Sequence, residues 1–267
     1  MESLRKRSDI SYFVITNPSK LIDLIENSKI FIVEGFFLLM NLLPYLKGKA
    51  LVDIATIKKI VGAKPKYASL VLQRLVKSRV LKKVTRNRYT SLSNPYIIAT
   101  NLYTPSYLSF WSASQYLGLT EQIVNTIHIV TTSPHQSIQF EQYTFKFIVL
   151  PKKYFFGFEK VQTEEGAIFI VDKEKLFIDA LLRPREMGNF DEIENVIQKA
   201  EINKEKIANY LQRTKNASVI KKVGYLLETY KSIDLYPQFK IKDKNYVRLN
   251  PFTQKTKKNV AKWRIKL

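Results

Sequence analysis

The chain has 267 residues, 45% of them hydrophobic and 12% aromatic, which is enough to build the cores of two domains of ordinary size. It has no cysteine and two histidines, so disulfides and thiolate metal sites are excluded, and we expect neither a metal nor another cofactor. The best candidate for a membrane span, residues 30–46, is interrupted by Glu34, Asn41 and Pro44, and the first residues do not resemble a signal peptide. We therefore expect a globular, cytoplasmic protein without a membrane partner.

The formal net charge of +21 is distributed unevenly along the chain. Residues 1–92 hold 18 Lys and Arg against 6 Asp and Glu, net +12, and residues 238–267 hold 10 against 1, net +9. Residues 93–237 hold 16 of each sign. A neutral middle between two cationic ends indicates contact with a polyanion at particular surfaces, and nucleic acid is the expected polyanion.

The chain begins with a basic arm, residues 1–9, in which Arg5 and Arg7 could follow a phosphate backbone or enter a minor groove. A disordered tail is the alternative for this arm. Apolar residues at helical spacing then predict two helices, over residues 17–26 and 33–46.

The stretch from Asp53 to Leu92 has the pattern of a winged helix. Isoleucines at helical spacing predict a short helix over residues 54–61, which Gly62 ends. A second helix begins at Lys64-Pro65 and runs to Lys77, with an apolar stripe made of Ala68, Val71, Leu72, Leu75 and Val76. Residues 80–84 and 88–92 predict two strands around a three-residue turn, which forms the wing.

The polar faces of the second helix and of the hairpin predict a DNA interface, because cations and hydrogen-bonding groups suit phosphates and base edges in a major groove. The predicted DNA-binding residues are Lys64, Lys66, Tyr67, Ser69, Leu70, Gln73, Arg74 and Lys77 of the helix, Lys82, Lys83, Arg86 and Arg88 of the hairpin, and Arg5 and Arg7 of the arm. A basic helix face can also be only a solvated surface, so the prediction rests on the order of these elements taken together.

The composition changes after Leu92, and two proline-containing segments, 93–95 and 103–105, bracket a short connection. We therefore predict a winged-helix domain over residues 1–95 and a mixed α/β domain with a central sheet over residues 104–267, an α+β protein as a whole. The second domain is expected to begin with a helix at 106–117. Strands are predicted at 126–132, 137–141, 143–150, 155–161, 167–171 and 240–249, and helices at 172–182, 190–200, 204–211 and 217–230.

The second domain shows no catalytic constellation, so we do not expect an enzyme. His128 lies in a predicted strand and His135 in a turn, and neither has a serine nucleophile motif nearby. Glu121-Gln122 fits a cap or turn, and Lys175 and Asp179, four residues apart on a helix, fit an ion pair. A nuclease with a carboxylate site in the sheet is the remaining enzymatic alternative.

Several blocks in order carry a family resemblance: residues 75–81 and 88–92, Ser-Ala-Ser-Gln-Tyr-Leu-Gly-Leu-Thr-Glu-Gln-Ile at 112–123, then 172–181 and 223–228. They resemble the AbiEi antitoxin family of transcriptional regulators over nearly the full length, and the block at 112–123 is the most specific. Arg79 stands where a glycine is common in that family.

The resemblance implies an autorepressor whose N-terminal winged helix binds inverted repeats in its own promoter. It also implies a C-terminal domain that counteracts a nucleotidyltransferase toxin of an abortive-infection toxin–antitoxin system without forming a stable complex. The residues alone leave a second class of function open, a winged-helix module that binds a protein or an RNA and has no toxin partner.

Overall fold

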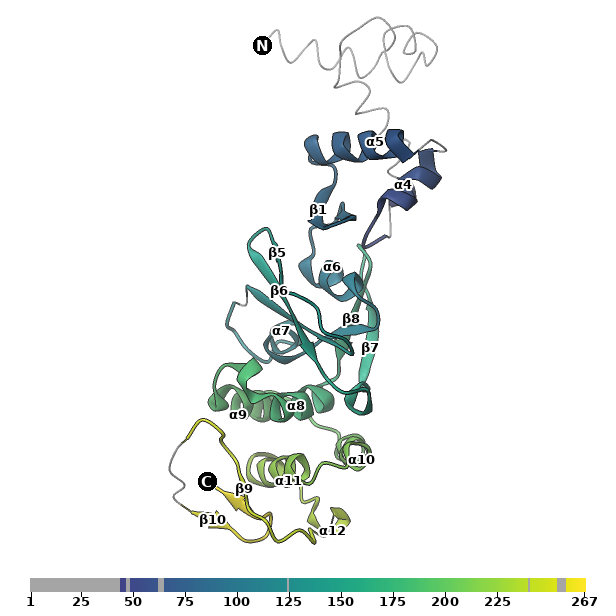
Figure 1. Ribbon diagram of the computed structural model, residues 1–267. Coiled ribbons are helices and arrows are strands. Elements are labelled where there is room, and N and C mark those ends of the chain that lie inside the picture. Colours follow the sequence, from purple (N-terminus) through teal and green to yellow (C-terminus); the bar gives the residue numbers. More distant parts are fainter. Residues whose placement is uncertain (1–43, 47–48, 62–64, 124, 240, 254–257) are drawn as a thin grey trace, which may run out of the picture. The chain divides into compact units, whose positions relative to one another are not determined.

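The computed structural model describes residues 44–46, 49–61, 65–123, 125–239, 241–253 and 258–267 (Figure 1). The basic arm with Arg5 and Arg7, the predicted helix at 17–26, most of that at 33–46, and Lys64 lie outside these ranges. The chain divides into two compact units, Met1–Ser91 and Leu92–Leu267. The fold is α+β, and its central element is a six-stranded mixed sheet in the second unit. Within the described ranges, no helix combines the length and apolar character needed to cross a membrane.

After a helical stretch at residues 44–46, the described part of the first unit has two helices followed by a hairpin. Helix α4 (Ile54–Val61) and helix α5 (Pro65–Lys77) precede the antiparallel strands β1 (Lys82–Thr85) and β2 (Arg88–Thr90). The apolar residues that recur at helical spacing face a common core, made of Leu46, Val52, Ile57, Ala68, Val71, Leu72, Leu75 and Leu81. The two helices lie where the sequence predicts them, and both strands are shorter than expected. Strand β1 begins two residues late and includes Thr85, so the turn has two residues instead of the predicted three.

Helix α5 ends with a residue in the left-handed conformation. The N–H of Val80 donates to the carbonyl of Leu75 at 3.0 Å, and Arg79 between them has φ of 61°. Glycine is the usual residue at such a helix end because it adopts positive φ without steric cost. Arg79 therefore closes the helix in the ordinary way while accepting a strain of about 1 kcal/mol.

The central sheet has the strand order β5-β6-β4-β3-β8-β7. Its strands are β3 (Ser106–Leu108), β4 (Thr126–Thr131), β5 (Ile138–Phe140), β6 (Tyr143–Val149), β7 (Phe158–Gln162) and β8 (Ala167–Val171). Strand β4 runs parallel to β6 and antiparallel to β3, and β3 runs parallel to β8. The structure confirms the five strands predicted between residues 126 and 171.

Two segments at the start of the second unit were predicted wrongly. Residues 106–108 form the inner strand β3 instead of opening a helix, and helix α7 (Phe110–Tyr116) begins only after Ser109. The predicted connection is helix α6 (Pro95–Leu102), which packs on β3, β4 and β8. Asn94 caps α6 by accepting hydrogen bonds from the N–H groups of Tyr96 and Ile97, so the Asn-Pro pair marks a helix start.

Four helices follow the sheet, α8 (Lys173–Leu182), α9 (Phe190–Lys199), α10 (Lys204–Thr214) and α11 (Ala217–Lys231). Each begins after an Asp or Asn whose side chain accepts a hydrogen bond from the first turn: Asp172, Asn189, Asn203 and Asn216. Helix α8 contacts α7, α9, α10 and α11, and Figure 1 shows α8 and α9 side by side. The structure confirms all four predicted helices, with ends that differ by a few residues.

The described C-terminal residues form a small structure of their own. Strands β9 (Val247–Arg248), β10 (Asn259–Val260) and β11 (Ile265–Lys266) make a three-stranded sheet after the short helix α12 (Tyr236–Phe239). Strands β9 and β11 contact α11, so this segment packs on a helix and does not extend the central sheet. The strand predicted over residues 240–249 is therefore wrong except at 247–248.

Candidate functional site

The predicted DNA-binding residues of α5 lie on one side of the helix. Lys66, Tyr67, Leu70, Gln73 and Lys77 are exposed, and Ser69 and Arg74 are half-buried. We call these seven residues the α5 face. The opposite side of the helix is buried in the core, so its orientation is fixed by packing. Tyr67 and Leu70 keep 44% and 41% of their surface exposed, so they are accessible to a partner of this face.

The hairpin presents a second set of cations. Lys83, Arg86 and Arg88 are exposed, and Lys82 is half-buried. Arg86 lies in the turn, which Asn87 closes with φ of 55°, a conformation that asparagine tolerates better than most residues. We call Lys82, Lys83, Arg86 and Arg88 the hairpin cations.

The hairpin is tied to the start of α4 by side-chain and backbone contacts. Asn87 Oδ1 accepts a hydrogen bond from the N–H of Ile54 at 3.0 Å, and Arg88 lies 3.6 Å from the carboxylate of Asp53. Val52 and Tyr89 exchange two backbone hydrogen bonds, at 2.8 and 2.9 Å. Arg88 therefore has a partner within the protein, whereas the sequence predicts that it binds only phosphate.

The charge in this region is strongly one-sided. Residues 49–91 contain twelve Lys and Arg and one acidic residue, Asp53. The Asp53 carboxylate already accepts hydrogen bonds from the backbone and side chain of Thr56, and these, together with Arg88, hold its pKa below the usual range. Asp53 lies beside Arg88, and the excess of cations over residues 49–91 leaves a net positive potential.

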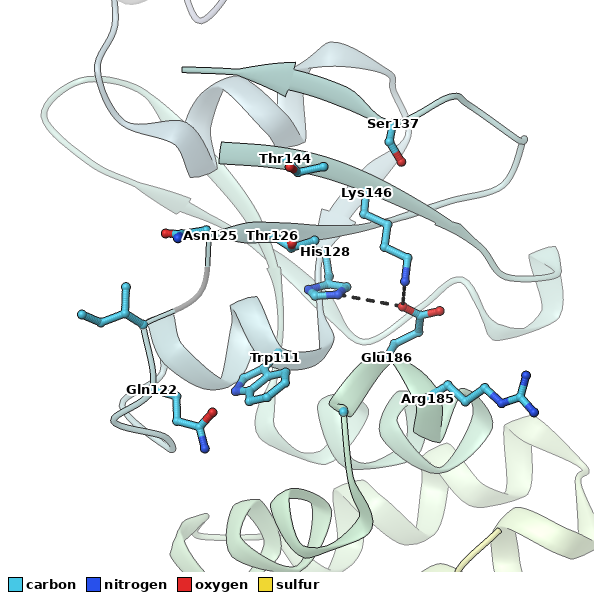
Figure 2. Close-up of a pocket in the computed structure, with 12 residues that line it drawn as sticks. Trp111, Gln122, Asn125, Thr126, His128, Ser137, Thr144, Lys146, Arg185 and Glu186 are labelled. Carbon is cyan, nitrogen blue, oxygen red and sulfur yellow. Dashed lines mark hydrogen bonds and ion pairs between the residues drawn. The ribbon is translucent and has the colours of Figure 1, made fainter. Parts of the chain in front are cut away.

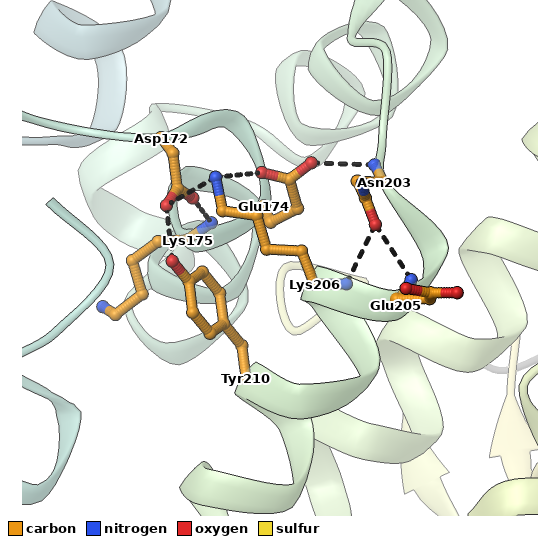
Figure 3. Close-up of polar contacts among 7 residues, drawn as sticks. All are labelled: Asp172, Glu174, Lys175, Asn203, Glu205, Lys206 and Tyr210. Atoms are coloured by element: carbon orange, nitrogen blue, oxygen red, sulfur yellow. Dashed lines mark hydrogen bonds and ion pairs between the residues drawn. The ribbon is translucent and has the colours of Figure 1, made fainter.

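Residues 172–181, one of the blocks that carry the family resemblance, have a structural role in the second unit (Figure 3). Asp172 caps α8 and accepts a hydrogen bond from the hydroxyl of Tyr210 at 2.6 Å. Glu174 accepts one from the N–H of Asn203, and Lys206 pairs with both carboxylates, at 3.1 and 3.3 Å. These contacts fasten the start of α10 to the start of α8.

Lys175 and Asp179 form the predicted ion pair within α8, but both side chains are completely buried. The carboxylate also accepts hydrogen bonds from the hydroxyls of Tyr107 and Ser109. Burial lowers the pKa of Lys175 and raises that of Asp179, because it penalises the charged form of each. Because neither side chain reaches the surface, the Lys175–Asp179 pair is part of the core.

The block at 223–228 anchors the C-terminal segment. Trp263 packs on Gly224, and its indole N–H donates to Glu228 at 2.6 Å. Lys262 also pairs with Glu228, at 2.8 Å. The sequence alone indicates no partner for this block, since Trp263 lies far along the chain.

The two histidines are held in different surroundings, and neither completes a catalytic group. His135 stacks on Tyr103 with ring centroids 3.7 Å apart. His128 Nδ1 lies 3.3 Å from the hydroxyl of Ser112, and Nε2 lies 3.8 Å from Glu186. Ser112 cannot serve as a nucleophile, because it is fully buried and its hydroxyl donates to the carbonyl of Thr126 while accepting from the N–H of His128.

Among the residues that the structure describes, no group of three or more His, Asp or Glu is placed to hold a metal ion. The sequence matches no protein-family model, and the comparison with curated proteins found no match. The candidate site therefore rests on the chemistry of the α5 face and the hairpin cations, while the blocks at 172–181 and 223–228 serve the packing of the second unit.

Proposed function

We propose that the protein is a DNA-binding transcriptional regulator whose N-terminal unit is a winged helix. In this proposal α5 is the recognition helix and the β1–β2 hairpin is the wing. The observation that carries the proposal is the ratio of twelve cations to one carboxylate over residues 49–91, seven of the cations belonging to the α5 face and the hairpin cations. A helix of this kind fits a B-form major groove, and hairpin cations fit the phosphates beside it.

We further propose, on the strength of the resemblance to AbiEi antitoxins, that the protein acts in the cytoplasm and represses its own promoter at inverted repeats. Its second unit would counteract a nucleotidyltransferase toxin without a stable complex. The charge along the chain supports DNA binding by the first unit, since residues 1–92 carry net +12, while in the second unit the excess positive charge is confined to residues 238–267, net +9. We propose no catalytic role for the protein itself.

The test of DNA binding is a footprint on the DNA upstream of the protein's own gene. Protection of two related half-sites is the expected result, because an inverted repeat bound by two copies of a winged helix is protected at matching positions. Absence of protection, combined with tighter binding to structured RNA than to DNA, would replace this proposal with an RNA-binding module.

The antitoxin role needs a separate test, since a repressor could act without a toxin. A nucleotidyltransferase encoded beside the gene is expressed in cells with the wild-type protein or with a Lys83→Gln/Arg86→Gln variant. Growth should be restored by both proteins if the second unit neutralises the toxin directly. Restoration by neither would leave a regulator without antitoxin activity.

A further inference from the structure

A pocket of about 510 Å³ opens on the second unit among β4, β6, α7 and the short helix η2 (Pro184–Met187) (Figure 2). Trp111 comes from α7, His128 from β4, Lys146 from β6, and Arg185 and Glu186 from η2. The volume is typical of sites for small organic molecules. None of these five residues belongs to the α5 face or the hairpin cations.

The pocket contains a hydrogen-bond donor that the protein does not use. The indole N–H of Trp111 is buried and has no acceptor among the described residues. Figure 2 shows the indole nitrogen on the side of Gln122, which also lines the pocket. The ring is held in place by close packing, since a Cβ on Gly188 would lie 2.6 Å from it. A buried donor without an acceptor costs about 1–3 kcal/mol, and an ordered water or a bound ligand can supply the acceptor.

The charged groups of the pocket favour an anion. Lys146 and Arg185 are positive and Glu186 is negative, so these three residues sum to +1. Lys146 donates to Glu186, which leaves two of its ammonium hydrogens for a ligand. Arg185 is exposed at the rim, where its guanidinium forms no ion pair with any residue that the structure describes.

His128 does not alter this balance at neutral pH. Burial, and secondarily the nearby charge of Lys146, lower its pKa to about 4, so the ring is neutral. Of the other polar groups that line the pocket, the Gln122 amide donates to Glu192 and the Thr144 hydroxyl donates to Gln139. The hydroxyls of Thr126 and Ser137 and the amide of Asn125 form no hydrogen bond within the described structure. With Trp111, Lys146 and Arg185 these groups make six donor side chains, more than the about four hydrogen bonds that a carboxylate accepts, whereas a phosphate monoester has three terminal oxygens.

We propose that this pocket binds a small organic phosphate monoester with a planar, acceptor-bearing body, such as a nucleoside monophosphate. The terminal phosphate oxygens accept hydrogen bonds from Lys146 and from Arg185, whose exposed side chain extends away from Lys146 in Figure 2 and turns toward the ligand on binding. Arginine suits this contact because its guanidinium can donate two parallel bonds. The planar body meets the edge of the Trp111 indole at its nitrogen and accepts the hydrogen bond of the N–H, which a local shift of the lining opens to the ligand. This inference does not depend on DNA binding, because every residue involved belongs to the second unit.

The experiment uses the full chain and its own tryptophans. The chain has two, and Trp263 is 1% exposed against α11, outside the pocket, so a ligand-induced change in emission reports on Trp111. The probes are adenosine and uridine 5′-monophosphates, the parent nucleosides, inorganic phosphate and citrate. We expect saturable binding of a monophosphate, with the nucleoside and inorganic phosphate weaker by about tenfold or more, since each can form only part of the interactions.

Two variants test the residues. Arg185→Gln should weaken monophosphate binding about tenfold, because it removes a charge-assisted hydrogen bond. Arg183→Gln is the matched control, an exposed arginine two residues away that does not line the pocket, and it should bind like the wild type. Trp111→Phe, followed by calorimetry, should weaken binding severalfold while the protein stays folded.

Three results would overturn the proposal. The first is the absence of saturation by either monophosphate up to about 10 mM, a concentration outside the range of specific ligand affinities. The second is binding of citrate or the nucleoside that is as tight as binding of the monophosphate. The third is an equal loss of affinity in the Arg183 and Arg185 variants. The last result would mean that only the overall charge attracts the probe.

Discussion

Trp263 lies directly against Gly224 of α11, so close that a Cβ on residue 224 would come within 2.2 Å of the indole ring. The indole N–H donates to Glu228, one turn further along the same helix. Glycine is therefore required at this helix position by the close approach of an aromatic ring, although it weakens a helix. The pair joins the C-terminal segment to the helices of the second unit.

Gly224→Ala should destabilise the second unit by about 1–3 kcal/mol, because the added methyl group overpacks the contact with Trp263. This cost should exceed the gain of about 1 kcal/mol in helix propensity that alanine brings. Urea unfolding of Gly224→Ala, Trp263→Leu and the double variant measures the coupling. Strict additivity of the two single changes would contradict the packing argument.

The buried pair in α8 gives a second stability prediction. Lys175→Met should cost about 3–5 kcal/mol, because it leaves the Asp179 carboxylate buried without its cation. Lys206→Met is the matched control, since Lys206 also pairs with carboxylates near α8 but keeps 42% of its side chain exposed. That exposed pair should contribute less than about 1 kcal/mol. Equal losses of stability in urea unfolding would show that burial of the pair does not matter.

His128 should make stability depend on pH. Its pKa is about 4 in the folded protein, because of burial, and about 6.5 in an unfolded chain. Unfolding therefore takes up a proton in this window, so the contribution is fully present above about pH 6.5 and is lost as the pH falls toward 4. The free energy of unfolding should drop by about 2 kcal/mol from this group between pH 7.5 and pH 5. His128→Gln should remove that part of the pH dependence, and an unchanged profile in the variant would assign it to other groups.

Arg74 on the α5 face tests recognition of bases. Arg74→Ala should cost about 1–3 kcal/mol at the cognate site if the guanidinium contacts a base edge, and much less on random DNA. Equal losses of affinity on both DNAs would restrict Arg74 to a phosphate contact. Leu72→Asp serves as the folding control, because Leu72 is 5% exposed in the core of the first unit and a charge there should unfold it.

The hairpin cations should bind the DNA backbone without reading sequence. Replacing Lys83 and Arg86 with glutamine should lower the slope of log K against log salt by about 0.9 for each phosphate that the variant no longer neutralises. Lys152→Gln/Lys153→Gln, two exposed lysines of the second unit, is the matched control and should leave the slope unchanged. A slope unaltered in the Lys83/Arg86 variant would remove the hairpin from the interface.

Much of the fold is predictable where local chemistry decides it. The capped helix start at Asp172 and the alternating strand at Thr126 are local signals, and the structure confirms them. Strand β3 is different, because Ser106, Tyr107 and Leu108 are all buried between two neighbouring strands and show no alternation of polar and apolar residues. Helix α6 was missed because Asn94-Pro95 serves equally in turns and at helix starts.

Of the two candidate sites, one is predictable from the sequence and the other is not. The cations of the α5 face follow from helical spacing, so the sequence predicts which of them share a face. The pocket in the second unit depends on long-range contacts, such as that of Lys146 with Glu186, forty residues apart. Nothing near Trp111 in the sequence indicates that its indole N–H is left without an acceptor.

The hydrogen bond from the N–H of Ile54 to the side chain of Asn87 connects residues 33 positions apart. The Ile54 amide therefore reports whether the hairpin stays in contact with α4. Exchange of the Ile54 amide hydrogen with solvent is slow only while the turn of the hairpin stays in place, since its acceptor lies in that turn. If a bound duplex displaced the hairpin, exchange would accelerate at this amide, while the amides deeper in α4, bonded within the helix, would keep their protection. A hairpin that stays in place during binding would leave the exchange rate at Ile54 the same as in the free protein.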